Sequence, residues 1–444
     1  MSEHEAARRL FPEAVFANSN IVLFEDDRTA RDLFPLTVLR PSWEIRIGAG
    51  TTRQWIEAIA GPGLPVMIRP RPGMQGMAVQ LGGPSDEDVD PEADLLFVNG
   101  RLIGLWPTDD LTEDLPDTLV DKDGRLLLAR RNVRRAPELL PLSGNELEAR
   151  LVQETGGEPL PEGWRLLYTR YFWDYMLANR EALERQLSHT GRATTELMNA
   201  HVLRELPTGV CFGDRVAGHP VYVGLGVRLM AGTVIGNHAG PIWIGPNTEI
   251  EPHTYLEGPL FIGPNCRIKA GTRFYGGCSL GQQCRVAGEI SASILQGFVN
   301  KQHEGFLGNS FLSQWVNLGA DTRTSNLRND YGPVKVQVGD QLVATGEMHV
   351  GLTAGDHAKT GINTMFNTGA VVGVGANVFG AGYPPRFIPS FSQGGAEGLK
   401  PGPLDRMLAI AREVMRRRDQ ELSDAEETLL RQHYSETVKG VRES

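Results

Sequence analysis

The sequence lacks the long apolar run that a membrane-spanning helix requires. No stretch of its 444 residues approaches about 18 consecutive apolar residues, so we expect no transmembrane helix. Residues 1–10 are rich in charge and are not followed by an apolar segment with a small-residue cleavage site, which argues against secretion. These absences favour a cytoplasmic protein.

Cysteine and net positive charge are also scarce. Four cysteines in a chain of this length do not form a disulfide framework. The formal net charge of -10 and the pI near 5.6 argue against a nucleic-acid partner. We therefore expect small-molecule ligands, with neither nucleic acid nor membrane as a partner.

Glycine, in contrast, is abundant and unevenly distributed. The chain has 52 glycines, about 12% of its residues, where about 7% is usual. Of these, 32 lie between Gly213 and Gly395, and the other 20 are spread over the remaining 261 residues. The second half of the chain must therefore repeat a tight turn.

That half contains a six-residue repeat. Eight apolar residues follow one another at this spacing: Ile244, Ile250, Leu256, Ile262, Ile268, Phe274, Leu280 and Val286. The fifth position of most hexads is small: Thr248, Thr254, Cys266, Thr272, Cys278 and Cys284. The period is expected to resume at Phe306, Leu312 and Leu318, and again near Ile362, Thr368 and Val374.

A period of six is typical of a parallel β-helix with three short strands in each coil. The leading aliphatic residue of each hexad points into the prism, and the small fifth residue fits inside the corner. Cys266, Cys278 and Cys284 all occupy that fifth position, so we interpret them as buried core residues and predict no metal site. The spacing leaves the hand open, but resemblance to other hexapeptide-repeat proteins implies a left-handed β-helix.

The rest of the chain has a different composition. Ile21–Phe24 and Leu95–Val98 are expected to be buried strands, whereas Thr52–Ala60 and Trp164–His189 are expected to be helices. Strands separated by helices predict an α/β domain with a mostly parallel sheet. We predict this domain with a connecting helix over residues 1–208, the β-helix over 209–397, and a helical tail over 398–444.

The interruptions of the repeat, between Val286 and Phe306 and over Asn326–Val350, are expected to be loops that leave the prism and line a groove. In and after the first one stand His303, Phe306, Leu307-Gly308, Asn317-Leu318-Gly319-Ala320 and Asn326. In order and spacing these resemble the acetyltransferase half of the bifunctional UDP-N-acetylglucosamine pyrophosphorylase/glucosamine-1-phosphate N-acetyltransferases. Asn329-Asp330-Tyr331-Gly332 resembles a further loop of that family.

The chemistry of acetyl transfer needs residues of these types. A base must take a proton from the attacking amine, and His303 suits that role because imidazole titrates near neutrality. Asn317 and backbone amides near Ala320 are candidate donors to the developing oxyanion. The resemblance also implies that Asn317, with Asn326 nearby, can instead orient the sugar amine.

Charged residues complete the expected acetyltransferase site. Lys269 aligns with a family arginine that binds the sugar phosphate, and Lys359 is a candidate for a phosphate of acetyl-CoA. Two positions depart from the family pattern. Phe306 replaces a tyrosine, and a lysine expected near Ala287 is missing, with Arg285 or Lys301 as the only replacements.

The N-terminal half lacks the glycine-rich loop with which such nucleotidyltransferases hold phosphates. Glu25-Asp26-Asp27-Arg28-Thr29-Ala30-Arg31 follows the first strand instead. Leu33–Pro41 and Glu44–Gly48 resemble a divergent bacterial branch of sugar nucleotidyltransferases, which implies a Rossmann-like α/β fold. If the domain is active, Arg28, Arg31, Arg40 and Arg46 are candidates for triphosphate binding, and Mg²⁺ is required.

Together these features predict an enzyme of amino-sugar nucleotide synthesis that acetylates a glucosamine 1-phosphate-like acceptor with acetyl-CoA. The N-terminal domain is the candidate for uridylyl transfer with UTP, and the resemblance implies a homotrimer. Three alternatives stay open: acyl transfer to another sugar nucleotide, a metal hydratase of the hexapeptide class, and a non-catalytic sugar-nucleotide sensor or scaffold. The hydratase would need a second histidine near His303 in the same coil, and the sequence has none.

Overall fold

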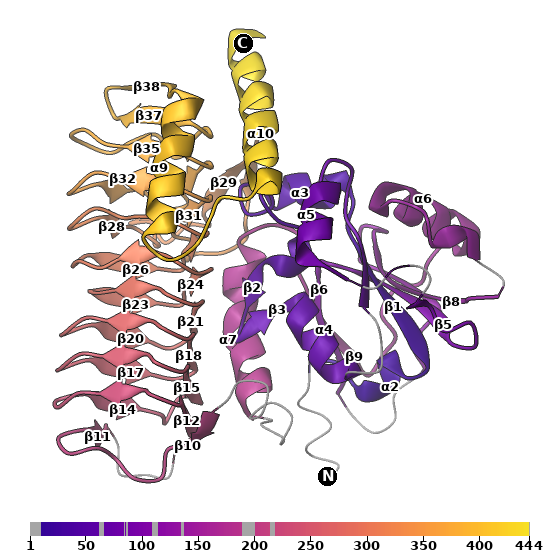
Figure 1. The fold of residues 1–444 in the computed structure, drawn as a ribbon, viewed down its shortest axis with the longest axis horizontal. Helices are drawn as coiled ribbons and strands as arrows, with labels where there is room; N and C mark the ends of the chain where they lie inside the picture. The colour runs from indigo at the N-terminus through magenta and orange to yellow at the C-terminus, as the bar shows by residue number, and fades with distance from the viewer. Residues whose placement is uncertain are drawn as a thin grey trace. The chain divides into compact units, whose positions relative to one another are not determined.

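The computed structural model describes residues 10–61, 66–83, 85, 88–108, 114–134, 137–188, 200–213 and 218–443, without the side chains of 13, 14, 154, 155 and 438–443. The chain forms two compact units (Figure 1). The first comprises Met1–Leu33, Arg40–Ile45 and Gly50–Tyr171, and the second comprises Phe34–Leu39, Arg46–Ala49 and Phe172–Ser444. The domain boundaries expected after residues 208 and 397 stay predictions.

A mixed sheet forms the centre of the first unit, with its described strands in the order β4-β1-β5-β8-β7. β1 (Ser19–Phe24), β4 (Val66–Arg69) and β5 (Asp94–Asn99) run parallel, and β8 (Leu126–Asn132) and β7 (Thr118–Val120) pair antiparallel to their neighbours. β1 is buried along its whole length, as expected of a central strand covered on both faces. The two predicted strands are confirmed.

Short helices and a second, small sheet complete the first unit. The helices are α2 (Glu13–Phe16), α3 (Asp27–Asp32), η1 (Ser42–Glu44), α4 (Thr52–Ala60), α5 (Gln75–Leu81), η3 (Pro137–Leu139) and α6 (Gly144–Thr155). The predicted helix over Thr52–Ala60 is confirmed as α4; a capping box of Thr51 and Gln54 fixes its start. The strand β3 (Gly50–Thr51) precedes it.

The helix expected over Trp164–His189 is wrong in its first part. Trp164–Tyr168 forms β9, which pairs antiparallel with β6 (Leu102–Pro107). The helix α7 starts only at Asp174 and extends to Ser188, and residue 189 lies outside the described residues. Cross-strand pairing with a distant segment overrides the local helical pattern, because strand propensity depends on tertiary partners.

The second unit is a β-solenoid whose coils stack into three ladders of parallel strands (Figure 1). Face 1 is the 10-stranded sheet β10 (Ala200–Val202), β12 (Val221–Gly224), β15 (Ile242–Ile244), β18 (Leu260–Ile262), β21 (Cys278–Leu280), β24 (Ile294–Leu295), β27 (Phe311–Leu312), β31 (Thr353–Ala354), β34 (Val371–Val372) and β36 (Phe387–Ile388). Only β10 pairs antiparallel in this described sheet. The predicted fold class is confirmed.

The other two faces use equally short strands. Face 2 contains β11 (Cys211–Phe212), β14 (Val234–Gly236), β17 (Tyr255–Glu257), β20 (Arg273–Tyr275), β23 (Glu289–Ser291) and β26 (Phe306–Gly308), and β28 (Arg323–Thr324) pairs with β33 (Met365–Phe366) above them. Face 3 contains β13 (Arg228–Leu229), β16 (Glu249–Ile250), β19 (Arg267–Ile268), β22 (Arg285–Val286) and β25 (Asn300–Lys301), and then β32 (Lys359–Thr360), β35 (Asn377–Val378), β37 (Ser392–Gly395) and β38 (Gly398–Pro401).

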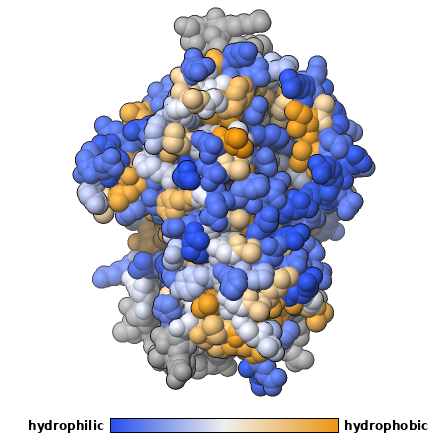
Figure 2. All heavy atoms as spheres, turned by 90° about the vertical axis from the view of Figure 1, so that its left-hand side faces the viewer, coloured by the Kyte–Doolittle hydropathy of each residue, from blue (hydrophilic) through white to orange (hydrophobic). Residues whose placement is uncertain are grey.

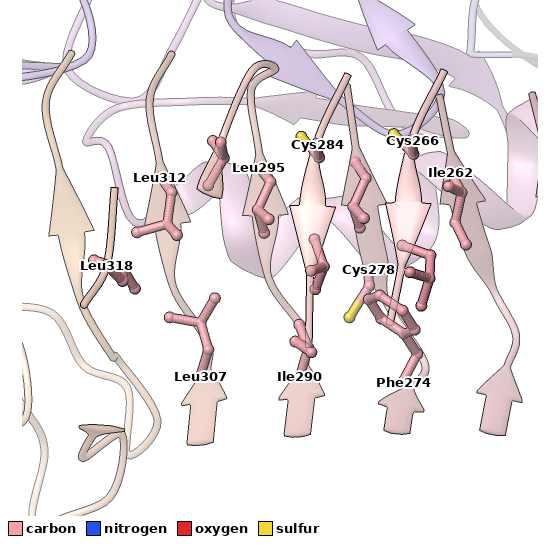
Figure 3. Packing of buried hydrophobic residues seen from close by; sticks show 14 of the residues in the cluster. Ile262, Cys266, Phe274, Cys278, Cys284, Ile290, Leu295, Leu307, Leu312 and Leu318 are labelled. Atoms are coloured by element: carbon pink, nitrogen blue, oxygen red, sulfur yellow. The ribbon is translucent and has the colours of Figure 1, made fainter. Parts of the chain in front are cut away.

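The core of the solenoid confirms the first series of hexads. All eight leading residues from Ile244 to Val286 are fully buried, and the three cysteines lie inward among them (Figure 3). Burial raises the pKa of Cys278 to about 12, so its thiol is neutral. The interpretation of these cysteines as core residues agrees with their positions.

Two later assignments of the repeat are wrong. Leu307, not Phe306, is the inward residue, since Leu307 pairs with the buried Ile290. Ile362 is 71% exposed, and the buried series at this level is Ala354, Phe366, Val372 and Val378. Leu312 pairs with Ala354, 42 positions later. Because 42 positions are seven whole hexads, the inward residues after Ala354 keep the six-residue register of Leu312.

The two interruptions of the repeat have opposite effects. Between Val286 and Phe306 the chain stays in the prism as a shortened coil, in which Arg285 pairs with Asn300 after 15 positions instead of the 18 between Arg267 and Arg285. The expected loop is therefore absent from this described stretch. The second interruption does leave the prism, as the antiparallel hairpin of β29 (Lys335–Val338) and β30 (Gln341–Ala344).

Helices pack against the solenoid within the second unit. α7 lies on face 1, where the Asn179 amide donates to the carbonyl of Gly277 at 2.7 Å, and β2 (Arg46–Ile47) contacts the same face. The predicted helical tail consists of α9 (Leu404–Arg416) and α10 (Asp424–Glu443). Among the described residues, no helix has the length and apolar character needed to cross a bilayer.

Candidate functional site

Polar side chains line the outer surface of face 3, in register from one coil to the next. Arg267, Arg285, Asn300, Asn317 and Lys359 are consecutive partners in this ladder. In-register strands are about 4.8 Å apart, so each side chain lies beside the next. The ladder face, as we call these five residues, therefore offers a continuous row of hydrogen-bond donors and cations.

His303 lies at the corner that follows the ladder face. Continuing the pairing of Asn300 with Asn317 by three positions sets His303 beside Ala320 in the next coil. The imidazole is exposed, and the Ala320 N–H has no acceptor among the residues that the structure describes. An exposed imidazole and a backbone N–H without an acceptor among the described residues thus share one corner, one coil apart.

Glycine makes this corner possible. Gly305 has a φ of +123°, and a Cβ on it would lie 2.1 Å from the carbonyl oxygen of Thr322. Only glycine allows the two coils to stack so closely here. The stacking is what holds the His303 segment against the coil of Ala320.

Lys301, one of the expected substrate ligands, points into the prism rather than outward. It occupies the inward position above Val286 and is 2% exposed. Its ammonium group donates to the carbonyl of Ala287 at 2.9 Å and to the carbonyl of His303. Burial lowers the pKa of Lys301 to about 8. This geometry gives Lys301 a structural contact with the His303 segment, away from the ladder face.

The remaining substrate candidates lie on face 2 and in the second interruption of the repeat, which contains the hairpin of β29 and β30. Phe306 and Asn326 meet over Gly308, where an added Cβ would be 2.4 Å from the phenyl ring and 2.9 Å from the amide nitrogen. The Asn326 amide also donates to Asn309 Oδ1 at 2.8 Å. Tyr331 precedes the hairpin and is 69% exposed.

Two lysines lie towards opposite ends of the ladder face: Lys359 is its last residue, and Lys269 follows its first residue, Arg267, by two positions. Lys269 lies at the corner two coils below His303 and is half-buried. Lys359 lies one coil above Asn317, donates to the carbonyl of His357 at 3.2 Å, and has a pKa that burial lowers to about 8. Lys269 and Lys359 thus lie two coils below and two coils above the coil of His303.

Arg418, just after α9, is a residue that the sequence analysis missed. Its guanidinium donates to the carbonyl of Gln283 and to Asn300 Oδ1, both at 2.8 Å. Met415, one turn earlier, packs with Phe298 and Trp315, whose rings stack at 4.2 Å. The tail thus reaches the ladder face, and only the cluster of arginines at 416–418 signals this in the sequence.

The four arginines expected at a nucleotide site have different surroundings. Arg28 and Arg31 are exposed on α3, whereas Arg40 is buried. Arg46 belongs to the second unit, where its guanidinium lies 5.4 Å from the centre of the Phe261 ring on face 1. Burial lowers the pKa of Arg46 to about 10. Arg28, Arg31 and Arg40 belong to the first unit, so Arg46 is the one of the four that lies in the other unit.

A polar cluster instead occupies the carboxyl ends of β1, β4 and β5. Such ends of parallel strands are the usual ligand position in open α/β sheets. After β1, Asp26 caps α3 by accepting from the Thr29 N–H at 2.8 Å. Glu148 of α6 hydrogen-bonds to Asp26. Burial and then Asp26 raise the pKa of Glu148 to about 7. For Asp26, burial acts upward, but the hydrogen bonds of Glu148 and Thr29 outweigh it and lower its pKa.

Two ion pairs surround Asp26 and Glu148. The Arg71 guanidinium contacts the fully buried carboxylate of Glu25, which also accepts from the Ser42 N–H at 2.7 Å. Burial raises the pKa of Glu25 despite these contacts. Arg101 and Asp121 form a second, fully buried ion pair at 3.4 Å. Arg71 and Arg101 are therefore each partnered by a carboxylate of the same unit.

Mg²⁺ does not fit this cluster as it stands. Hard cations prefer several ionised oxygen ligands, but Asp26 and Glu148 are bonded to each other and Arg101 lies among the carboxylates. Asn99 supplies only a neutral amide, and its Oδ1 accepts from the Arg101 N–H at 3.1 Å. Within the described ranges, no group of three or more His, Cys, Asp or Glu residues could hold a metal.

Comparison with known proteins finds one matching family model and several similar proteins. A family model described as sugar nucleotidyl transferase matches residues 21–192. A bifunctional sugar-1-phosphate nucleotidylyltransferase/acetyltransferase of Sulfurisphaera tokodaii is 32% identical over 91 residues, which are 20% of this chain and 23% of that protein. The bifunctional protein GlmU of Methanocaldococcus jannaschii is 36% identical over 85 residues, which are 19% of this chain and 21% of that protein.

The chain thus spans less than a quarter of these curated relatives. It combines a sugar-nucleotidyltransferase-type domain with a β-solenoid and has a partial, distant similarity to such bifunctional proteins. A solved structure, that of the polySia specific acetyltransferase NeuO, matches 44% of this chain and 80% of its own at 11% identity. Its TM-score of 0.16 is too low to support an argument.

Proposed function

We propose that the solenoid transfers an acetyl group from acetyl-CoA to the amine of a glucosamine 1-phosphate-like sugar. The observation that carries this proposal is the register that brings His303 beside Ala320, with Asn317 on the adjoining ladder face. An exposed imidazole, a free backbone N–H and a side-chain amide within two coils are the groups that amide formation needs.

In the proposed reaction the acetyl group moves from the sulfur of acetyl-CoA to the nitrogen of the sugar amine. The sugar amine attacks the thioester carbonyl carbon, a C–N bond forms, and the C–S bond breaks to release the thiolate of coenzyme A. His303 takes the proton that the amine loses and returns it to the leaving thiolate. Asn317 orients the amine, and the Ala320 N–H donates to the oxyanion of the tetrahedral intermediate.

Further parts of the site follow from this assignment. Lys359 is the proposed cation for a phosphate of acetyl-CoA, and Lys269 is one of several cations for the phosphate of the acceptor. Phe306 and Asn326 form the wall on face 2. Tyr331 is proposed to contact the acceptor only in an assembly of several chains. We propose a homotrimer in which acetyl-CoA lies between neighbouring solenoids; sedimentation velocity with a monomeric mass would contradict this.

The test of acetyl transfer uses the complete chain with acetyl-CoA and glucosamine 1-phosphate, and follows release of the free thiol. His303→Ala is expected to lower kcat by about 10² to 10⁴, the usual contribution of a general base. His238→Ala is the matched control, because His238 is an exposed corner histidine several coils away. No thiol release by the wild type, or equal rates in both variants, would refute the proposal.

For the first unit we propose binding of a sugar nucleotide without nucleotidyl transfer. The observation that favours this is the Asp26 carboxylate, which occupies the start of α3 where a glycine-rich loop would receive phosphates. Two cations of this cluster, Arg71 and Arg101, are already paired with carboxylates. Release of pyrophosphate from UTP, Mg²⁺ and a sugar 1-phosphate would overturn this assignment in favour of uridylyl transfer.

A further inference from the structure

Two guanidinium groups lie against the same two coils of the solenoid. Arg285 projects from the ladder face, and its in-register neighbour in the next coil is Asn300. Arg418 from the tail donates to Asn300 Oδ1, and also to the carbonyl of Gln283, two residues before Arg285. Since neighbouring coils are about 4.8 Å apart, the two cations are held close together.

Neither of these cations has a counterion among the residues that the structure describes. Arg267, one coil below Arg285, is neutralised by Glu251 at 2.6 Å and by Glu249 at 3.8 Å. In contrast, no carboxylate of a described residue forms an ion pair with Arg285 or Arg418. Burial and then the charge of Arg285 lower the pKa of Arg418, as expected for two like charges held together.

The position of Arg418 is fixed by apolar contacts that need no ligand. Met415 is 3% exposed and packs with Phe298 and Trp315 at the corner beside face 3. The stretch from Met415 to Arg418 therefore remains on the solenoid, and the guanidinium is held with two of its N–H groups already engaged. A guanidinium has five N–H donors, so further donors of Arg418 are left for another acceptor.

We propose that Arg285 and Arg418 form an anion subsite that binds the phosphate group of the acceptor, so that the C-terminal tail contributes to the substrate site. This inference rests on the proposed acetyl transfer. Guanidinium groups suit the task because their fixed forks match phosphate oxygens. The subsite adjoins Asn300, one coil below Asn317, so a sugar bound there directs its amine along the ladder face towards His303.

The experiment compares wild type with Arg285→Gln, Arg418→Gln and Arg418→Lys. Arg416→Gln is the matched control, because it removes one charge from the same tail where Arg416 already pairs with Glu413. KM for glucosamine 1-phosphate is expected to rise about tenfold in each Gln variant, the loss typical of one charge-assisted hydrogen bond, and less in Arg418→Lys. KM for unphosphorylated glucosamine should not change in any variant.

Calorimetric titration with glucosamine 1-phosphate separates this subsite from the proposed reaction. If glucosamine 1-phosphate also binds elsewhere in the chain, the heat of that binding is the same in all variants. The difference in heat between wild type and each variant therefore reports binding at Arg285 and Arg418. Weaker binding in Arg285→Gln and Arg418→Gln supports the subsite even if no acetyl transfer occurs. Acetyl transfer with unchanged KM and unchanged binding in both Gln variants overturns the subsite and leaves the reaction intact. Arg285→Gln alone decides the matter if the tail variant fails to fold.

Discussion

The buried ammonium group of Lys301 allows a quantitative test of the solenoid structure. Its pKa falls from 10.5 to about 8 because burial penalises the charged form. The folded state therefore loses the proton of Lys301 at a lower pH than the unfolded state does. Between about pH 8 and pH 10.5 the unfolded chain holds more protons, so stability must rise with pH in that window.

The size of this effect follows from the two pKa values. The full difference corresponds to about 3 kcal/mol, and the part gained between pH 7 and pH 9.5 is about 2 kcal/mol. Lys301→Met removes the titration and leaves the carbonyls of Ala287 and His303 without their donor. We therefore expect the variant to lose stability relative to wild type as pH rises.

Urea unfolding followed by far-ultraviolet circular dichroism measures this difference at pH 7 and pH 9.5. Subtracting the variant from the wild type cancels the titration of every other group, provided the two unfold in the same way. Lys335→Met, which alters an exposed lysine on the hairpin, should run parallel to wild type at both pH values. A Lys301→Met curve that also runs parallel would refute the inward, desolvated position of the ammonium group.

Three further predictions concern the corner, the tail and the first unit. Gly305→Ala should destabilise the solenoid by about 1–3 kcal/mol and slow acetyl transfer, since its Cβ would lie 2.1 Å from the Thr322 oxygen; unchanged thermal unfolding would contradict the stacking. Trp315→Ala should cost about 3–5 kcal/mol, because Trp315 is 5% exposed between the solenoid and the tail. Loss of this contact should release the tail and speed trypsin cleavage at the arginines 416–418; cleavage at the wild-type rate would argue against that packing. Glu148, with its pKa raised to about 7, should make the first unit less stable as pH rises from about 4.5 to 7. Glu148→Gln should weaken this dependence in thermal unfolding, with the remainder due to Glu25, whose pKa is also raised; an unchanged slope would contradict the raised pKa of Glu148.

The local sequence pattern predicts those features that depend on near neighbours. The period of six predicts which residues enter the prism from Ile244 to Val286, because each inward residue packs on its equivalents in the coils above and below. The buried strands β1 and β5 follow from their apolar runs in the same way. His303 is different, because the broken period predicts a loop outside the prism, and only the pairing of Asn300 with Arg285 and Asn317 keeps this stretch in a coil.

The tertiary structure decides what depends on distant segments. Trp164–Tyr168 becomes a strand because β6 pairs with it. The inward residues that follow the hairpin of β29 and β30 are set by the pairing of Leu312 with Ala354. Lys301 turns inward because the shortened coil gives its ammonium group two carbonyls to bind, which no local pattern encodes. The contact of Arg418 with Asn300 joins residues 118 positions apart, and only packing of the tail through Met415 brings them together.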